Sequence, residues 1–154
     1  MHYGPNGQDR HTLEEIGHHP GTTRERVRQI ELRALELLSR RSEKVKGRKI
    51  IKQYKAGNRN FSRVTLRRAD LEGADLRNIN LSLAYLGQAN LHNANLIGAN
   101  LTGCDLIKAN LRNADLANAD LRRANLYKAD VTSAQLAQAK SLEGAILPDG
   151  GRHE

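Results

Sequence analysis

Residues 86–106 read Leu-Gly-Gln-Ala-Asn-Leu-His-Asn-Ala-Asn-Leu-Ile-Gly-Ala-Asn-Leu-Thr-Gly-Cys-Asp-Leu. Leu occupies every fifth position from Leu66 to Leu126, Phe61 precedes the series, and Val131 and Leu136 follow it. Ala stands two residues before most of these positions, and Asn or Asp stands immediately before 13 of the 16. The second half of the chain is therefore a five-residue repeat.

A period of five fits neither regular secondary structure. On an α-helix a step of five residues turns about 500°, which would spread the leucines around every face. On a straight strand an odd step sends successive leucines to opposite sides. The pattern is consistent when the chain turns a corner every five residues, with one Leu and one Ala of each side pointing inward. Four sides close a square coil, the repeat predicts about four coils, and the short Asn and Asp side chains are expected at the corners.

Residues 54–150 resemble the pentapeptide-repeat family, and cyanobacterial members in particular, at the entry (54–62) and exit (137–150) of the repeat as well as within it. The resemblance implies a mainly β fold, a right-handed quadrilateral β-helix over 59–138. Residues 44–56, which include Ile50, Ile51 and Tyr54, are expected to cap one end, because open coils expose unpaired backbone. Residues 139–154 are expected to form the C-terminal cap and tail, with the register broken around 135–147.

The N-terminal third predicts a short helix-turn-helix. Thr12-Leu13-Glu14-Glu15 fits a capping box, and the sequence from His18 to Gly21 ends that helix. Thr22 or Thr23 would cap a second helix that runs to about Ser39. Its apolar stripe consists of Val27, Ile30, Ala34, Leu37 and Leu38. An amphipathic helix that packs on the solenoid explains this pattern equally well.

Residues 3 to about 41 resemble region four of primary-type bacterial sigma factors, through the stretches 3–7, 12–17, 23–31 and 34–35. That region reads the −35 promoter element in double-stranded DNA with its second helix. The resemblance implies that Arg24, Glu25 and Gln29 face the bases, while Arg26 and Arg28 hold the DNA backbone.

Two departures separate this segment from the sigma family. Pro20 and Thr22 occupy places where the family has apolar residues that seat the two helices together. The chain also begins inside the motif, without the helices that normally precede it. We therefore expect a DNA-reading fragment joined to a β-helix, and not a complete sigma factor.

Positive charge is concentrated ahead of the repeat. The chain has a formal net charge of +8, yet residues 24–68 contain 16 Lys or Arg and only four Glu, a net charge of +12. Such a stretch is typical of a polyanion binder, although a solvated basic linker is the alternative. Further candidate contacts to the DNA backbone are Arg33, Arg40, Arg41, Lys44 and Lys46. A possible basic face of the repeat carries Arg67, Arg68, Lys108 and Lys128.

Several function classes are not expected. The single Cys104 falls in the inward Ala register, the six histidines show no metal-site spacing, and the aspartates form no catalytic pair. We expect no enzyme, no cofactor and no metal. Residues 59–138 carry a net charge of +3, which disfavours imitation of DNA toward topoisomerases. No apolar run reaches the ~20 residues that span a bilayer, so we expect no membrane contact and a cytoplasmic bacterial protein.

The predicted organisation has four parts: a sigma-like helix-turn-helix (1–41), a basic connector with a cap helix (42–58), the β-helix (59–138) and the C-terminal cap and tail (139–154). We expect a DNA-binding, transcription-associated protein whose β-helix packs on those helices, binds RNA polymerase or another protein, or joins two copies as a homodimer. The alternative is a protein-interaction scaffold whose helices no longer bind DNA.

Overall fold

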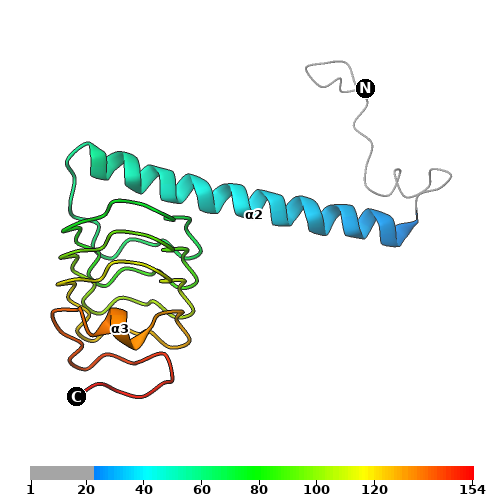
Figure 1. The fold of residues 1–154 in the computed structure, drawn as a ribbon. Helices are drawn as coiled ribbons and strands as arrows, with labels where there is room; N and C mark the ends of the chain where they lie inside the picture. Colours follow the sequence, from blue (N-terminus) through cyan, green and yellow to red (C-terminus); the bar gives the residue numbers. More distant parts are fainter. Residues whose placement is uncertain (1–22) are drawn as a thin grey trace. The chain divides into compact units, whose positions relative to one another are not determined.

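The computed structural model describes residues 23–154. The chain divides into two units between Arg41 and Ser42. The described helices are α2 (Arg24–Lys55) and α3 (Ser133–Leu136), and the remainder is a stack of coils (Figure 1). The predicted helix that begins at Thr12 lies outside the described residues.

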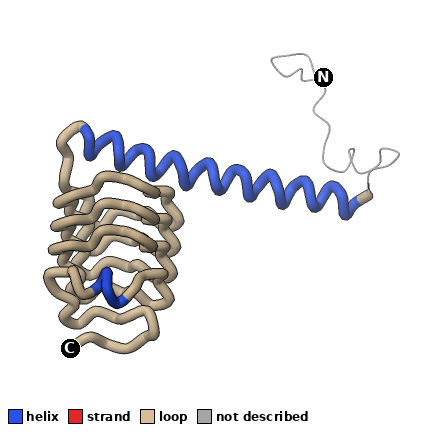
Figure 2. The backbone as a smooth tube through the Cα atoms, in the orientation of Figure 1, coloured by secondary structure: helices blue, strands red, loops and turns tan. Residues whose placement is uncertain are grey.

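The coils are held together by parallel bridges between residues that lie 20 apart, such as Asn95 and Asp115. Leu96 N–H donates to the Asp115 carbonyl at 2.9 Å, and Asp115 N–H donates to the Ala94 carbonyl at 3.0 Å. Within residues 23–154 these pairings are isolated bridges, so the coils have the tan colour of loops in Figure 2 and no part of them is red. The predicted β-helix is confirmed as a coil of 20-residue steps.

The corners lie after each leucine, and not at the Asn or Asp before it, so that prediction was wrong. Ala69 N–H donates to the Leu66 carbonyl at 3.0 Å, which closes a tight turn, and the intervening Arg68 has φ 57°. The Asn and Asp side chains brace the bridge position: Asn95 Oδ1 accepts from Ile97 N–H at 3.1 Å. A short acceptor two residues upstream fits this role because it satisfies an amide that the ladder leaves unpaired.

The leucines and alanines of the repeat form the core. Leu96, Leu101 and Ala99 have no exposed surface, and no polar or charged side chain is buried among the described residues. Apolar burial contributes about 25 cal/mol per Å², so this uniform interior is the main source of stability. The predicted inward register of Leu and Ala is confirmed.

Helix α2 is longer than predicted. The second helix of the helix-turn-helix was expected to end near Ser39, and 42–58 to form a connector with a separate cap helix. The structure instead has one helix of 32 residues that ends at Lys55. Between Ser39 and Lys55 there is no Pro, and Gly47 stays helical because it is buried against the backbone of Asp70. Neither α2 nor α3 has the length and apolar content to cross a bilayer.

The C-terminal end changes register by one residue. Helix α3 begins with a capping box in which Thr132 Oγ1 accepts from Gln135 N–H at 3.2 Å. Beyond it the bridges join residues 21 apart, as in Asn125 and Ile146. The last residues then fold back, and Arg152 forms an antiparallel bridge with Ile146. Coil pairing thus extends past residue 138, where the β-helix was predicted to end.

Candidate nucleic-acid interface

The first turn of α2 presents the predicted base-reading residues to solvent. Thr23 caps the helix: its Oγ1 accepts from Arg26 N–H at 3.2 Å. Arg24, Glu25 and Arg26 follow directly and are exposed. An exposed helix N-terminus of this kind offers free amides and a partial positive charge to a phosphate.

Glu25 organises the two neighbours that lie one turn further along α2. Its Oε2 accepts from Arg28 Nε at 3.2 Å, and its Oε1 accepts from Gln29 Nε2 at 3.4 Å. Glu25 and Gln29 therefore lie side by side, as their spacing of four residues implies. The pairing of Arg28 with Glu25 was not predicted, although the i, i+3 spacing carried the signal. Arg28 uses its Nε for this carboxylate, so its Nη groups are left to donate to a phosphate.

The predicted backbone-contacting cations further along α2 are all exposed: Arg33, Arg40, Arg41, Lys44 and Lys46. Arg40 is paired, since its Nη2 lies 2.7 Å from Glu36 Oε1. Both side chains of this pair are well exposed, and such pairs contribute little to stability. Arg40 can therefore exchange Glu36 for a phosphate at small cost.

The apolar stripe of the first unit is exposed among the described residues. Ile30, Leu37 and Leu38 keep 51%, 58% and 62% of their surface. Leu32 and Leu35 are exposed as well, and they lie outside the predicted stripe.

The predicted basic face of the repeat is a single face of the coil stack. Arg68, Lys108 and Lys128 occupy the same register position in coils 20 residues apart, with Gln88 between the first two. Arg68 Nε donates to Gln88 Oε1 at 3.1 Å, and Lys128 Nζ lies 5.1 Å from the centre of the Tyr127 ring. Arg67 is exposed on the same side. Among the described residues, none of these four cations forms an ion pair.

Three other arginines of the repeat are neutralised by aspartates. Arg77 pairs with Asp75, Arg122 with Asp120 and Arg112 with Asp130, at 2.7, 2.6 and 2.7 Å. Hydrogen bonds from the Arg77 and Arg122 side chains lower the pKa values of Asp75 and Asp120, which keeps both carboxylates charged. Arg67, Arg68, Lys108 and Lys128 thus differ from these three arginines, because no carboxylate of the described residues neutralises them.

Cys104 lies in the core, and its Sγ donates to the Leu81 carbonyl at 2.7 Å. Burial raises the pKa of the thiol to about 12, so the nucleophilic thiolate is scarce at neutral pH. In the part of the chain that the structure describes, no group of His, Cys, Asp or Glu is arranged to hold a metal ion.

Two family models match the sequence. The model described as pentapeptide repeats matches in eight copies, over residues 58–82, 84–121 and 104–140. The model of sigma-70 region 4 matches residues 1–40. No curated protein matches the chain significantly in sequence.

Several solved structures with similar sequences are pentapeptide repeat proteins. HetL from the cyanobacterium Nostoc sp. strain PCC 7120, a protein involved in heterocyst differentiation regulation, is 43% identical over 61% of this chain and 43% of its own, with a TM-score of 0.45. A protein from the thylakoid lumen of Arabidopsis thaliana is 31% identical over 58% of each chain, with a TM-score of 0.47. Another Nostoc protein is 40% identical over 64% of this chain and 73% of its own, with a TM-score of 0.41. The chain spans less than two thirds of the length of the first two.

Proposed function

The chain belongs to the pentapeptide-repeat family, and from this premise we propose that it is a DNA-binding, transcription-associated protein that joins a sigma-like reading helix to a β-helical scaffold. The observation that carries the proposal is the match of residues 1–40 to sigma-70 region 4, with Arg24, Glu25 and Gln29 exposed on α2. Its partner is double-stranded DNA with a −35-like sequence. The protein performs no catalysis and works in the bacterial cytoplasm, where that DNA is.

The chemistry of these side chains suits base edges in the major groove. Arg24 can donate to a guanine edge, Glu25 can accept from a cytosine amine, and Gln29 suits an adenine edge. Glu25 and Gln29 are held together by their hydrogen bond, so they would enter the groove as a pair. The cations along α2 supply the phosphate contacts that set affinity without reading sequence.

Sequence reading predicts a selective loss of affinity in two variants. Arg24→Ala or Gln29→Ala should cost about 1–3 kcal/mol on a −35-like duplex and little on a scrambled duplex. Arg41→Ala, which removes only a phosphate contact, should weaken binding to both duplexes equally. A paired titration of the two duplexes with the wild type and the three variants measures this. Equal affinity of the wild type for both duplexes would contradict sequence reading.

Electrostatic binding predicts a strong salt dependence. Arg40, Arg41, Lys44, Lys46, Arg48 and Lys49 lie within ten residues and are all exposed. If about four to six phosphates are neutralised, log K against log salt should slope near −4 to −5. Fluorescence anisotropy of a labelled duplex across a salt series measures the slope. A flat dependence, or no binding at low salt, would favour a scaffold without DNA.

A protein-interaction scaffold is the second candidate, because Ile30, Leu37 and Leu38 of α2 are exposed. In that case the helix docks on RNA polymerase, another protein or a second copy through these side chains. The coil stack, which we propose to be right-handed with about four turns as in the family, then serves as the rigid support. This candidate would be favoured if the wild-type chain did not bind DNA but did bind a protein through the exposed side chains of α2.

A further inference from the structure

The first coil of the repeat ends in an edge of unpaired backbone. In later coils Tyr85 N–H donates to the Val64 carbonyl and the Tyr85 carbonyl accepts from Leu66 N–H, at 2.9 and 2.8 Å. Thr65 holds the equivalent place in the first coil, where no earlier coil exists. Among the described residues, neither Thr65 N–H nor the carbonyls of Ser62 and Thr65 form a hydrogen bond. Such an edge is a template for another strand.

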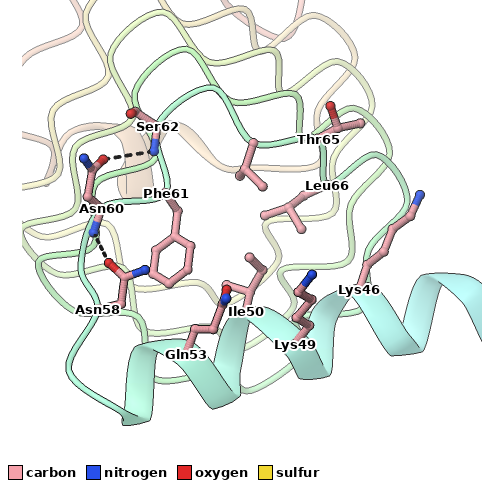
Figure 3. A pocket seen from close by; sticks show the side chains of 11 residues that line it. Lys46, Lys49, Ile50, Gln53, Asn58, Asn60, Phe61, Ser62, Thr65 and Leu66 are labelled. Atoms are coloured by element: carbon pink, nitrogen blue, oxygen red, sulfur yellow. Dashed lines mark hydrogen bonds between the residues drawn. The ribbon is translucent and has the colours of Figure 1, made fainter.

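Helix α2 packs against this coil beyond Thr65, at Asp70 and Arg77. The backbone of Gly47 packs against the Asp70 carbonyl, and Tyr54 Oη donates to the Arg77 carbonyl at 2.8 Å. Between the helix and residues 58–66 a groove of about 470 Å³ is left open (Figure 3). The edge at Thr65 is thus next to a hollow large enough for side chains of a bound segment.

The lining of the groove specifies the chemistry of its occupant. Ile50, Phe61 and Leu66 point into the hollow and make an apolar floor, together with Val64 (Figure 3). Lys46 and Lys49 stand on the helix side, and no Asp or Glu lines the groove. This arrangement suits an aliphatic side chain with a carboxylate close to it.

At the opposite end of the stack, the C-terminal tail covers the backbone edge of the last coil. There the tail folds back antiparallel: Leu147 N–H donates to the Gly151 carbonyl and His153 N–H to the Ala145 carbonyl, at 2.7 and 2.8 Å. An added extended segment therefore pairs with the backbone of the last coil. At the first coil, no described segment supplies an equivalent strand to Thr65.

We infer that the edge at residues 60–66 binds an extended peptide of a partner protein, which adds a strand to the first coil. Alternate residues of an extended segment point to the same side. An aliphatic side chain of the peptide enters the hollow over Phe61, and a carboxylate beside it meets Lys46 and Lys49. Main-chain hydrogen bonds give affinity and the hollow gives specificity, as in other cases of strand addition. This site shares Lys46 and Lys49 with the proposed phosphate contacts, lies apart from the base-reading Arg24, Glu25 and Gln29 in the sequence, and goes beyond the proposed function.

The test begins with selection of random heptapeptides displayed on phage against the full chain. The enriched sequences should alternate aliphatic with other residues and carry at least one carboxylate. Titrated into isotope-labelled full chain, they should bind with a Kd on the order of micromolar and slow the hydrogen exchange of the Thr65 amide. No enrichment, or binding that leaves the Thr65 amide unchanged, would overturn the inference.

Matched variants separate the site from general attraction of acidic peptides. Lys49→Glu should weaken binding about tenfold, because it places a carboxylate opposite the peptide's own. Lys52→Glu, the same change on an exposed residue of α2 that does not line the groove, should leave affinity nearly unchanged. N-methylation of the peptide amide that faces the edge should also weaken binding, by about threefold to tenfold.

Two further results would each overturn the inference. One is equal weakening by Lys49→Glu and Lys52→Glu, which would mean that only net charge attracts the peptides. The other is a chain that sediments as a dimer and already protects the Thr65 amide without peptide. In that case a second copy, and not a partner's peptide, occupies the edge.

Discussion

Leu96→Asp is expected to unfold the β-helix. Leu96 has no exposed surface and lies in a core without polar side chains among the described residues, so the new carboxylate would find no partner. Burial of an unpaired charge costs at least several kcal/mol, which is comparable to the whole stability of a small domain. Urea denaturation followed by far-ultraviolet circular dichroism should show the loss of the cooperative transition.

Leu83→Asp is the matched control for this substitution. Leu83 belongs to the same repeat but keeps 48% of its surface, and its φ of 58° is one that Asp tolerates better than Leu. The midpoint of urea denaturation of Leu83→Asp should stay close to that of the wild type. Equal behaviour of the two variants would contradict the inward register of the leucines.

Gly47→Ala is expected to destabilise the protein although it lies within a helix. Helix propensity alone favours Ala over Gly by about 1 kcal/mol. At this position, however, the added methyl would overlap the carbonyl oxygen of Asp70, a backbone atom that cannot swing away. The helix would have to move off the first coil and strain the burial of Ile50 and Tyr54. We expect a net loss of about 1–3 kcal/mol in the free energy of unfolding, as for other overpacked sites.

Gly87→Ala supplies the matched control. A Cβ there would meet Asp105 Oδ2 at 3.5 Å, an ordinary contact, and the backbone of Gly87 is not in the left-handed region. The change should be neutral or stabilise by up to about 1 kcal/mol, because it restricts the unfolded chain. Urea denaturation of both variants measures whether each substitution lowers or raises the free energy of unfolding. Stabilisation by Gly47→Ala would show that the helix does not press on the coil.

The placement of the candidate DNA-reading residues along one helix was predicted from the sequence, whereas their contacts with DNA stay a prediction. The cap at Thr23 and the placement of Glu25 beside Gln29 follow from spacing along one helix. The pairing of Arg28 with Glu25 also obeys such a spacing, and Arg28 is the one cation that lies three or four residues from Glu25 in the sequence. The open edge at Thr65 carries no sequence signal, because it depends on which coil sides α2 leaves uncovered.

The coil follows from the amino-acid sequence alone. Each five-residue unit contacts its neighbours along the chain and the units about 20 residues away, so one short pattern, repeated, specifies the same burial of Leu and Ala every time. The end of α2 and the open edge of the first coil depend instead on long-range contacts in the folded protein. Gly has low helix propensity, so the sequence gives no reason for Gly47 to lie inside a helix. The folded structure gives one, because the coil brings the Asp70 carbonyl so close to Gly47 that a side chain would not fit. Contacts of that kind are made once and have no period, so no local pattern encodes them.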